Sequence, residues 1–305
     1  MRDPEGLYEL SAEVDEVPHG LHLIAGLTGF TDAGSTITQL SDYLLENLES
    51  RRVALFDADA LLDYRARRPI MFFDEDHLAE YKPATLALYL VEDELHQPFL
   101  LLTGYEPDFQ WERFTAAVLG LIERYQVRDT TWIHAIPMPV PHTRPIGVTV
   151  SGNRKELVES MSVWRPTTQV PANALHLLEY RLQEKGHPTA ALVLLVPHYL
   201  ADTEFPLATV RALESISAAT GLIFPTDPLR ELGREFMTKV DEQVSGNAEL
   251  QRLVETLEKR HDSYMEENPL PSPFASLDGE IPGADSIAAE LERFLATRPE
   301  GDDQG

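Results

Sequence analysis

The sequence lacks cysteine altogether among its 305 residues. Disulfides, thiolate catalysis, iron–sulfur clusters and cysteine-based zinc sites are therefore excluded. A globular chain of this length buries roughly 75% of the surface that it exposes when unfolded, so it can fold without covalent or metal cross-links. The absence of cysteine is compatible with a reducing compartment.

Long apolar runs are also missing. The longest, such as Ala190–Pro197, fall far short of the about twenty residues that a membrane-crossing helix needs. The N-terminal residues Met1–Gly6 are charged and contain no apolar core, so we expect no signal peptide. These features predict a cytoplasmic protein with no membrane partner.

Positive charge is scarce. Lysine and arginine number 25 against 51 aspartates and glutamates, which gives a formal net charge of −26. Such a charge repels phosphate backbones, so we expect no nucleic-acid partner. The acidic residues are scattered along the chain, which favours a role in solubility, although the same surface would also suit basic protein partners.

Familiar catalytic and cofactor motifs do not occur. The chain has no Walker-type phosphate loop, and Gly26–Gly29 does not fit the dinucleotide-binding fingerprint. Ser35 is not part of a Gly-x-Ser-x-Gly nucleophile turn. The sequence therefore predicts no catalytic residue, no metal and no cofactor.

Short apolar runs alternate with amphipathic segments through the first 225 residues. The predicted strands are 22–27, 52–56, 85–91, 98–103, 130–136, 146–150 and 190–196, and the predicted helices are 37–48, 111–125, 172–185 and 206–220. The short link between 85–91 and 98–103 indicates an antiparallel hairpin, which makes the sheet mixed. The alternation predicts an α/β fold, a three-layer α/β/α sandwich, for residues 1–225.

A helical extension is predicted for residues 226–268. Apolar residues step by three and four from Leu229 to Val240 and again from Leu250 to Tyr264. This stripe packs either on the core or on another subunit. Residues 269–305 are predicted to contain a linker, a short amphipathic helix and a disordered tail. The apolar face of that short helix consists of Ile287, Leu291, Phe294 and Leu295.

Two groups of residues are candidates for a site. The first group consists of loop residues that follow predicted strands: Thr28, Asp32, His142, Arg144, His198 and Tyr199. Because ligand crevices lie at the carboxyl ends of strands in open α/β sheets, these residues could all meet at one crevice. Asp32, His142 and His198 could hold a metal or serve as acid–base groups. Alternatively, Asp32 caps a helix and the histidines make structural hydrogen bonds.

The second group is a basic cluster in an otherwise acidic chain. It consists of Asp63, Arg65, Arg67 and Arg68. The planar guanidinium group of arginine binds carboxylates through two parallel hydrogen bonds and is common at interfaces, so we expect a salt-bridge network within or between subunits. The alternative is that the cluster binds an anion.

Four segments, in this order, resemble the PAC2 (proteasome assembly chaperone 2) family in its actinobacterial branch. They are Gly29–Gly34, Asp59–Pro69, Pro141–Pro145 and Val196–Tyr199. The resemblance runs from about residue 20 to residue 225. It implies an α/β/α core similar to the phosphorylase/hydrolase-like fold, and relatives that assist proteasome assembly or bind proteasome subunits as oligomers. The family has no accepted catalytic residues to carry over.

The leading hypothesis is a homo-oligomeric protein-binding scaffold, trimeric and chaperone-like. Its expected partners are further copies of itself and proteasome subunits. The alternatives are a hydrolase or phosphorylase-like enzyme, or a small-ligand sensor, that uses the crevice at the strand ends. Convergence of the candidate side chains on one pocket would favour these alternatives.

Overall fold

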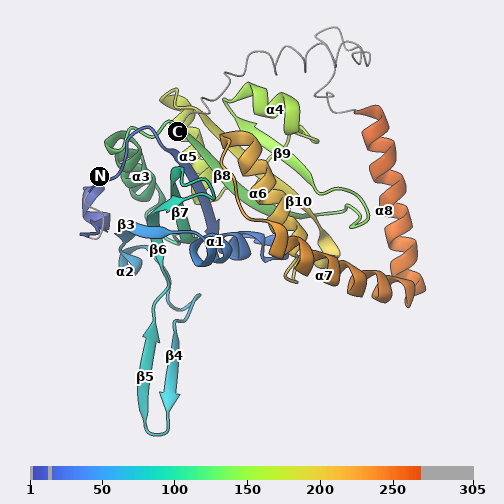
Figure 1. Ribbon diagram of the computed structural model, residues 1–305, viewed down its shortest axis with the longest axis horizontal. Coiled ribbons are helices and arrows are strands. Elements are labelled where there is room, and N and C mark those ends of the chain that lie inside the picture. The colour runs from blue at the N-terminus through green and yellow to red at the C-terminus, as the bar shows by residue number, and fades with distance from the viewer. Residues whose placement is uncertain (1–2, 13–15, 269–305) are drawn as a thin grey trace, which may run out of the picture.

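The computed structural model describes residues 3–12 and 16–268, and it has an eight-stranded sheet with helices on both faces (Figure 1). The strands of this sheet are β1 Tyr8–Leu10, β2 His22–Thr28, β3 Ser50–Phe56, β6 Leu86–Glu92, β7 Pro98–Tyr105, β8 Asp129–Met138, β9 Gly147–Gly152 and β10 Thr189–Pro197. The helices of the core are α1 Thr36–Asn47, α2 Ala58–Leu61, α3 Trp111–Arg124, α4 Lys155–Met161, α5 Ala174–Glu184 and α6 Pro206–Thr220, with short 3-10 turns η1 Glu5–Leu7, η2 Ala33–Ser35 and η3 His198–Leu200.

The sheet is mixed, and its order is β1-β3-β6-β7-β2-β8-β10-β9. Neighbouring strands β7, β2, β8 and β10 run parallel, whereas β6 is antiparallel to β7 and β9 is antiparallel to β10. The carboxyl ends of the parallel strands therefore meet at one edge, which we call the sheet rim. The predicted hairpin between β6 and β7 is confirmed.

Side chains alternate between the two faces of the sheet, as the pleat requires. In β2, Leu23 and Ala25 face the layer of α3 and α5, and Ile24 faces the layer of α1 and α6. In β8, Trp132 faces the first layer and Ile133 the second. Because both faces are covered, the central strands are apolar throughout, and in the sequence they appear as short continuous apolar runs.

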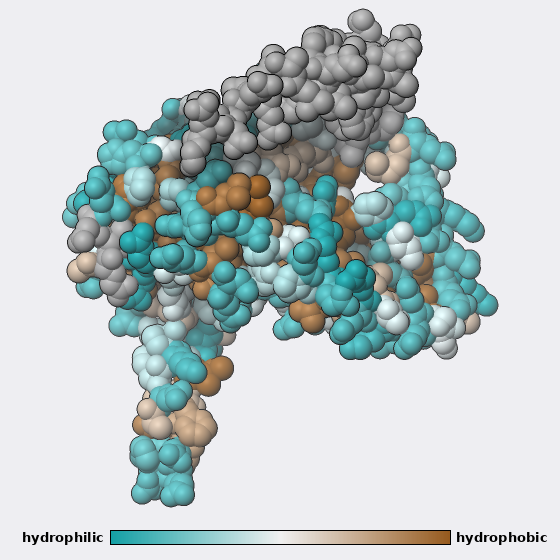
Figure 2. Space-filling model, in the orientation of Figure 1, coloured by the Kyte–Doolittle hydropathy of each residue, from teal (hydrophilic) through white to brown (hydrophobic). Residues whose placement is uncertain are grey.

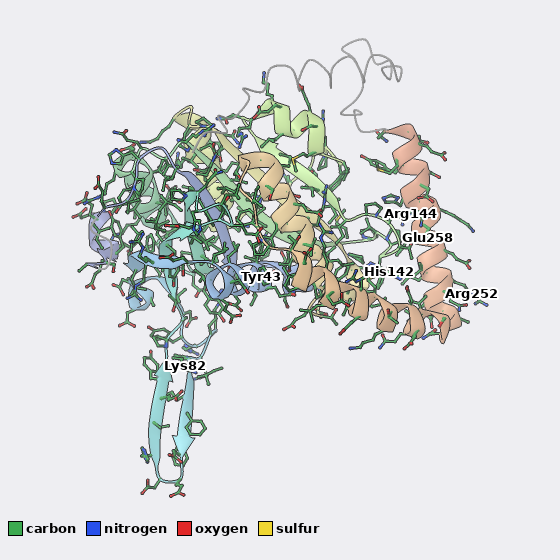
Figure 3. All side chains as sticks on the ribbon, viewed as in Figure 1. Tyr43, Lys82, His142, Arg144, Arg252 and Glu258 are labelled. Atoms are coloured by element: carbon green, nitrogen blue, oxygen red, sulfur yellow. The ribbon has the colours of Figure 1, made fainter. Side chains whose placement is uncertain are left out.

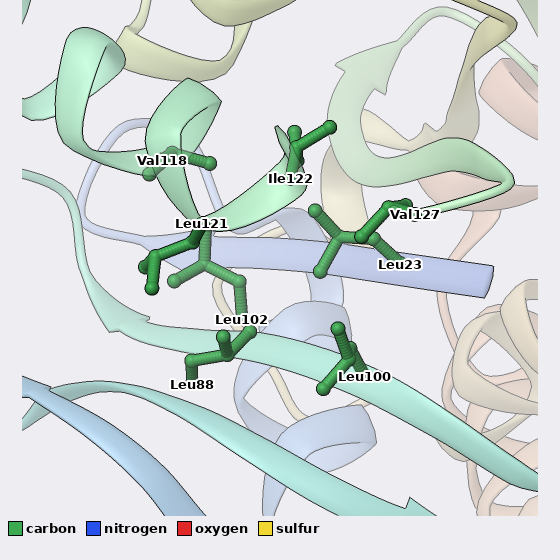
Figure 4. A pocket seen from close by; sticks show the side chains of 8 residues that line it. All are labelled: Leu23, Leu88, Leu100, Leu102, Val118, Leu121, Ile122 and Val127. Carbon is green, nitrogen blue, oxygen red and sulfur yellow. The ribbon is translucent and has the colours of Figure 1, made fainter. Parts of the chain in front are cut away.

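A small cavity lies between α3 and the sheet (Figure 4). It leaves only about 10 Å³ for the centre of a water-sized sphere, which is room for at most one water molecule. Its lining is entirely aliphatic: Leu23, Leu88, Leu100, Leu102, Val118, Leu121, Ile122 and Val127. Since an empty apolar cavity stays dry, this one is a packing defect of the core and offers a polar ligand no partner.

A second, two-stranded sheet projects from the body (Figure 1). It is a hairpin of β4 Ile70–Asp74 and β5 His77–Lys82, and it pairs with no other strand of the described chain. No strand was predicted for this segment. All the residues of both strands are exposed, so neither core cluster includes them.

Two long helices follow the core, α7 Asp227–Ser245 and α8 Ala248–Glu267. Helix α7 packs on α6 through Leu229 and Val240, whereas α8 turns away at Gly246 and stands apart from the sheet (Figure 1). Asn247 caps α8 by accepting hydrogen bonds from the amides of the first turn. The helices lie where the helical extension was predicted. The linker, short helix and tail predicted for 269–305 lie outside the described residues.

The structure confirms the predicted fold class, a three-layer α/β/α sandwich with a mixed sheet and C-terminal helices. Within residues 3–12 and 16–268, no helix is both long and apolar enough to span a membrane.

Candidate functional site

His142 and Tyr199 lie together beside α7, although 57 residues separate them in the sequence. The His142 backbone amide donates to Tyr199 Oη over 2.8 Å, and Tyr199 Oη lies 2.6 Å from His142 Nδ1. His142 Nε2 lies 3.2 Å from Asp241 Oδ1 on α7. These contacts are satisfied together when Nε2–H donates to Asp241 and the Tyr199 hydroxyl donates to Nδ1. The imidazole therefore fastens α7 to the core.

Arg144 fastens α8 in the same way (Figure 3). Its Nε and Nη2 donate to the two carboxylate oxygens of Asp262, over 2.9 and 2.7 Å. Its Nη1 donates to Glu258 Oε1 over 3.1 Å. The Arg144 hydrogen bond lowers the pKa of Asp262 to about 2. Both guanidinium edges are therefore occupied, and Arg144 has no free fork to offer an anionic ligand.

Of the other three candidates for the crevice, only His198 contacts the residues just described, through the Tyr199 ring. Asp32 accepts hydrogen bonds from the Ile37 amide at 2.7 Å and the Thr38 amide at 3.0 Å, in the first turn of α1. Thr28 donates its hydroxyl to the Gly104 carbonyl, over 3.3 Å. His198 is exposed and places its ring edge-on to Tyr199, 5.4 Å away. The six candidates thus divide among separate structural contacts and form no single acid–base centre; their role in ligand binding stays a prediction.

The basic cluster is less of a network than its composition suggests. Among residues 3–12 and 16–268, Arg67 is the one arginine of the cluster with an ion pair, which it forms with Asp108. Its guanidinium also lies 5.5 Å from the Tyr105 ring centroid. Arg65 and Arg68 are exposed and make no ion pair within the described parts of the chain. Asp63 accepts from the Arg65 amide in a local turn. Two arginines therefore remain available for a partner.

Arg67 reaches the sheet rim on the α3–α5 side. Gly29 has a φ of +124°, which favours glycine, and Arg67 Nη2 lies 2.9 Å from the position that a Cβ would take there. Close by, Glu106 accepts a hydrogen bond from the Ala174 amide at the start of α5, over 2.6 Å. Burial raises the pKa of Glu106, and the Ala174 amide and Arg67 oppose that shift.

His134 is a buried titratable group at the same rim, and no candidate set included it. It is 4% exposed, its Nε2 lies 3.3 Å from Thr31 Oγ1, and its ring is parallel to Phe30 at 6.2 Å. Burial, with a smaller contribution from nearby His176, lowers the pKa of His134 to about 4. His176 itself closes the capping box of α5 with Asn173, and burial lowers its pKa too.

One sequence signal could have identified His134: it is the one titratable side chain inside the apolar run 130–136. The neutral imidazoles and Glu106 could exchange hydrogen bonds or protons with a polar ligand. Within residues 3–12 and 16–268, no three histidine or carboxylate side chains are grouped so as to hold a metal ion.

The lowered pKa of His134 predicts a pH dependence of stability. The unfolded state, with a pKa of 6.5, takes up the proton as the pH falls below that value, while the native state resists until about pH 4. Stability from this residue is therefore present at pH 7 and is lost as the pH falls from 6.5 towards 4. We expect a loss of roughly 2 kcal/mol between pH 7 and 4.5, measured by urea unfolding at fixed protein concentration.

The matched variants are His134→Gln, which keeps a polar group for Thr31, and His19→Gln at an exposed histidine. His134→Gln should reduce the loss of unfolding free energy between pH 7 and 4.5 by roughly 2 kcal/mol. The second should follow the unaltered protein. Parallel curves for all three proteins would contradict a neutral buried His134.

Fold and site together define a class: an α/β/α sandwich with a projecting hairpin and two C-terminal helices fastened to the core by His142 and Arg144. The model of the PAC2 family matches residues 26–244. The chain belongs to the PAC2 family.

Solved structures agree with this assignment. A Corynebacterium glutamicum protein of unknown function is 35% identical, with a TM-score of 0.82, and the match covers 86% of this chain and 98% of that one. The Mycobacterium tuberculosis protein Rv2714, also of unknown function, is 40% identical with a TM-score of 0.80, covering 86% of this chain and 90% of its own. The predicted resemblance to actinobacterial members is thereby confirmed.

A more distant neighbour is the Mycobacterium tuberculosis proteasome-assembly chaperone homologue Rv2125. It is 19% identical, with a TM-score of 0.70, and the match covers 77% of this chain and 100% of that one. At this identity the likeness shows a shared fold. A search of curated proteins finds no match.

Proposed function

We propose that the protein is a homo-oligomeric protein-binding scaffold in which the β4–β5 hairpin of each copy packs on another copy. The observation that carries this proposal is the apolar stem of the hairpin, which stands in solvent (Figure 2). Ile70 is 77% exposed and Phe73 63%. The other exposed apolar side chains of the stem are Met71, Phe72, Leu78 and Tyr81.

An isolated two-stranded hairpin is marginally stable in water, because it has neither a third strand nor a hydrophobic face that is covered. This one also leaves the outer edges of both strands unpaired within the described chain. Exposed edges and a contiguous apolar surface mark sites of association. A neighbouring copy that covers the stem would bury its exposed apolar side chains and would shield its unpaired strand edges from water.

Charge favours a head-to-tail arrangement. The hairpin tip carries Asp74, Glu75 and Asp76, whereas the unpaired Arg65 and Arg68 directly precede β4 at the opposite end. Opposite charges at the two ends of one element are complementary between successive copies. A head-to-tail contact of this kind forms a closed ring when its rotation closes, and we propose a ring of three.

The proposed clients are proteasome subunits, bound by a chaperone-like scaffold. Support comes from membership of the PAC2 family and from the fold shared with a proteasome-assembly chaperone homologue. The net charge of −26 suits basic surfaces on such clients. Affinity capture from the native cell should enrich proteasome subunits over a tag-only bait. Their reproducible absence would remove the client and leave the oligomer to be judged separately.

Sedimentation equilibrium tests the oligomer. The protomer mass is 34.3 kDa, and we expect three times that mass at micromolar concentration. Because the stem contact is apolar, the assembly should persist at high salt. Its affinity should nevertheless fall there, because salt screens the attraction between the charged ends of the hairpins. A protomer-sized species under all conditions would remove the scaffold proposal.

A further inference from the structure

We propose that an aromatic and basic patch at the root of each hairpin receives the acidic hairpin tip of a neighbouring copy. The inference rests on the hairpin contact proposed above and adds the surface that accepts it. We call this surface the root patch, and it consists of Phe30, Tyr105, Phe109, Arg65 and Arg68.

Arg67 brings the aromatic side chains of the root patch together. Its guanidinium lies 5.5 Å from the Tyr105 ring centroid and forms an ion pair with Asp108. Its Nη2 also lies close to Gly29. The residues that follow Asp108 and Gly29 in the chain are aromatic: Phe109 and Phe30. The patch is therefore assembled from the loops after β2 and β7, around one guanidinium.

The aromatic side chains of the root patch are exposed. Phe109 is 51% exposed, Tyr105 39% and Phe30 37%. A group of exposed apolar side chains marks an interaction site more reliably than single ones do. Aromatic rings also supply a large contact area while losing little side-chain entropy on binding. The root patch therefore suits a partner that presents apolar side chains.

Charge identifies the partner as the hairpin tip. Arg65 and Arg68 are exposed and make no ion pair within the part of the chain that the structure describes, whereas Asp108 neutralises Arg67. The hairpin tip carries three consecutive acidic residues at 74–76. Guanidinium groups pair well with carboxylates, so the tip of one copy complements the root patch of another.

The apolar part of the hairpin lies beside its charged part, as it does in the root patch. Phe73 and Leu78 are opposite each other in the strand register, directly behind the acidic turn. They are 63% and 57% exposed. A tip that approaches the two free arginines thus carries these side chains towards the aromatic rings.

The hairpin cannot reach the root patch of its own chain. Tyr105 donates its backbone amide to the Thr85 carbonyl over 3.2 Å, only three residues after β5 ends, so the patch lies at the root. The tip is roughly 15 Å away along the strands and points away from the body (Figure 1). The occupant is therefore a second copy, in a head-to-tail contact.

A charge exchange tests this pairing by sedimentation equilibrium of the full chain. R65E/R68E reverses the root patch, and E75K/D76K reverses the two turn residues between the strands, so it leaves the β4–β5 ladder intact. We expect each pair alone to raise the Kd of association at least about tenfold, because like charges then face each other. The four substitutions in one chain should restore the original Kd to within about threefold.

Phe109→Asp tests the aromatic part of the patch. We expect it to raise the Kd at least about tenfold, with an unchanged circular dichroism spectrum. Leu95→Asp is the control, because Leu95 is exposed in the turn before β7, whereas Phe109 follows the opposite end of that strand. It should leave the Kd unchanged.

The outcomes separate this inference from the hairpin contact itself. An unaltered protein that sediments as a protomer would overturn both. If F72D/F73D dissociates the assembly but Phe109→Asp and R65E/R68E do not, the hairpin contact stands and the root patch is wrong. A fourfold variant that associates no better than R65E/R68E would also overturn the pairing of tip and patch.

Discussion

Replacing Phe72 and Phe73 with aspartate (F72D/F73D) is expected to convert the proposed oligomer into a 34.3 kDa protomer. The two rings are 58% and 63% exposed on the protomer, so the fold itself does not need them. Burying one such ring against a neighbour contributes about 2 kcal/mol. Losing both therefore weakens each contact by about 4 kcal/mol, or roughly a thousandfold in Kd. Sedimentation equilibrium measures this change directly.

Leu95→Asp is the matched control for the hairpin variant. Leu95 is 58% exposed in the turn between β6 and β7, so this variant places an aspartate at an equally exposed apolar site away from the hairpin, with one added charge against the two of F72D/F73D. We expect this control to keep the mass of the unaltered protein. Circular dichroism should be unchanged for both variants. An F72D/F73D protein with the original mass would show that the hairpin is not the contact between copies.

Gly104→Ala is expected to lower the free energy of unfolding by about 3 kcal/mol or more. Gly104 has φ of +132° near the end of β7, where it pairs with Leu86 of β6. A Cβ there would lie 2.0 Å from the Thr85 carbonyl oxygen and 2.6 Å from the Leu86 Cα. Neither backbone atom can move without breaking the β6–β7 ladder. Denaturant unfolding at fixed protein concentration gives the change.

Gly120→Ala provides the comparison for this glycine. Gly120 lies inside α3, and nothing is within 4 Å of the Cβ that alanine would add there. That substitution should stabilise the protein by about 0.5–1 kcal/mol, because alanine restricts the unfolded chain and suits a helix. Similar unfolding midpoints for the two variants would contradict the strain assigned to Gly104.

Most of the fold could be predicted because its strands are buried on both faces. Such strands appear as short apolar runs, and β2, β8 and β10 were recognised in this way. Pro206 at the start of α6 and Gly186 after α5, with φ of +69°, are local signals that need no tertiary information. The β4–β5 hairpin was missed because it buries no face, so it has no in–out alternation to detect.

The candidate site was harder to predict, because its contacts join residues far apart in the sequence. The sequence places His142 and Tyr199 after predicted buried strands, which suggested that they could approach the same edge of the sheet. It could not show that Asp241, 99 residues from His142, would bind the same imidazole. Asp32 could cap a helix or line a crevice, and only its distances to the amides of α1 identify the bonds that it makes.

The sequence by itself determined the class of fold, the lack of cysteine chemistry and the acidic surface, because these depend on composition and on local periodicity. Tertiary structure alone decided the rest. It brought Glu106, Arg67 and His134 to one rim, directed Arg144 to α8, and left the β4–β5 stem in solvent. The physical reason is that hydrogen bonds, burial and exposure depend on which strands become neighbours, and the order of strands in a sheet is not written in any single segment.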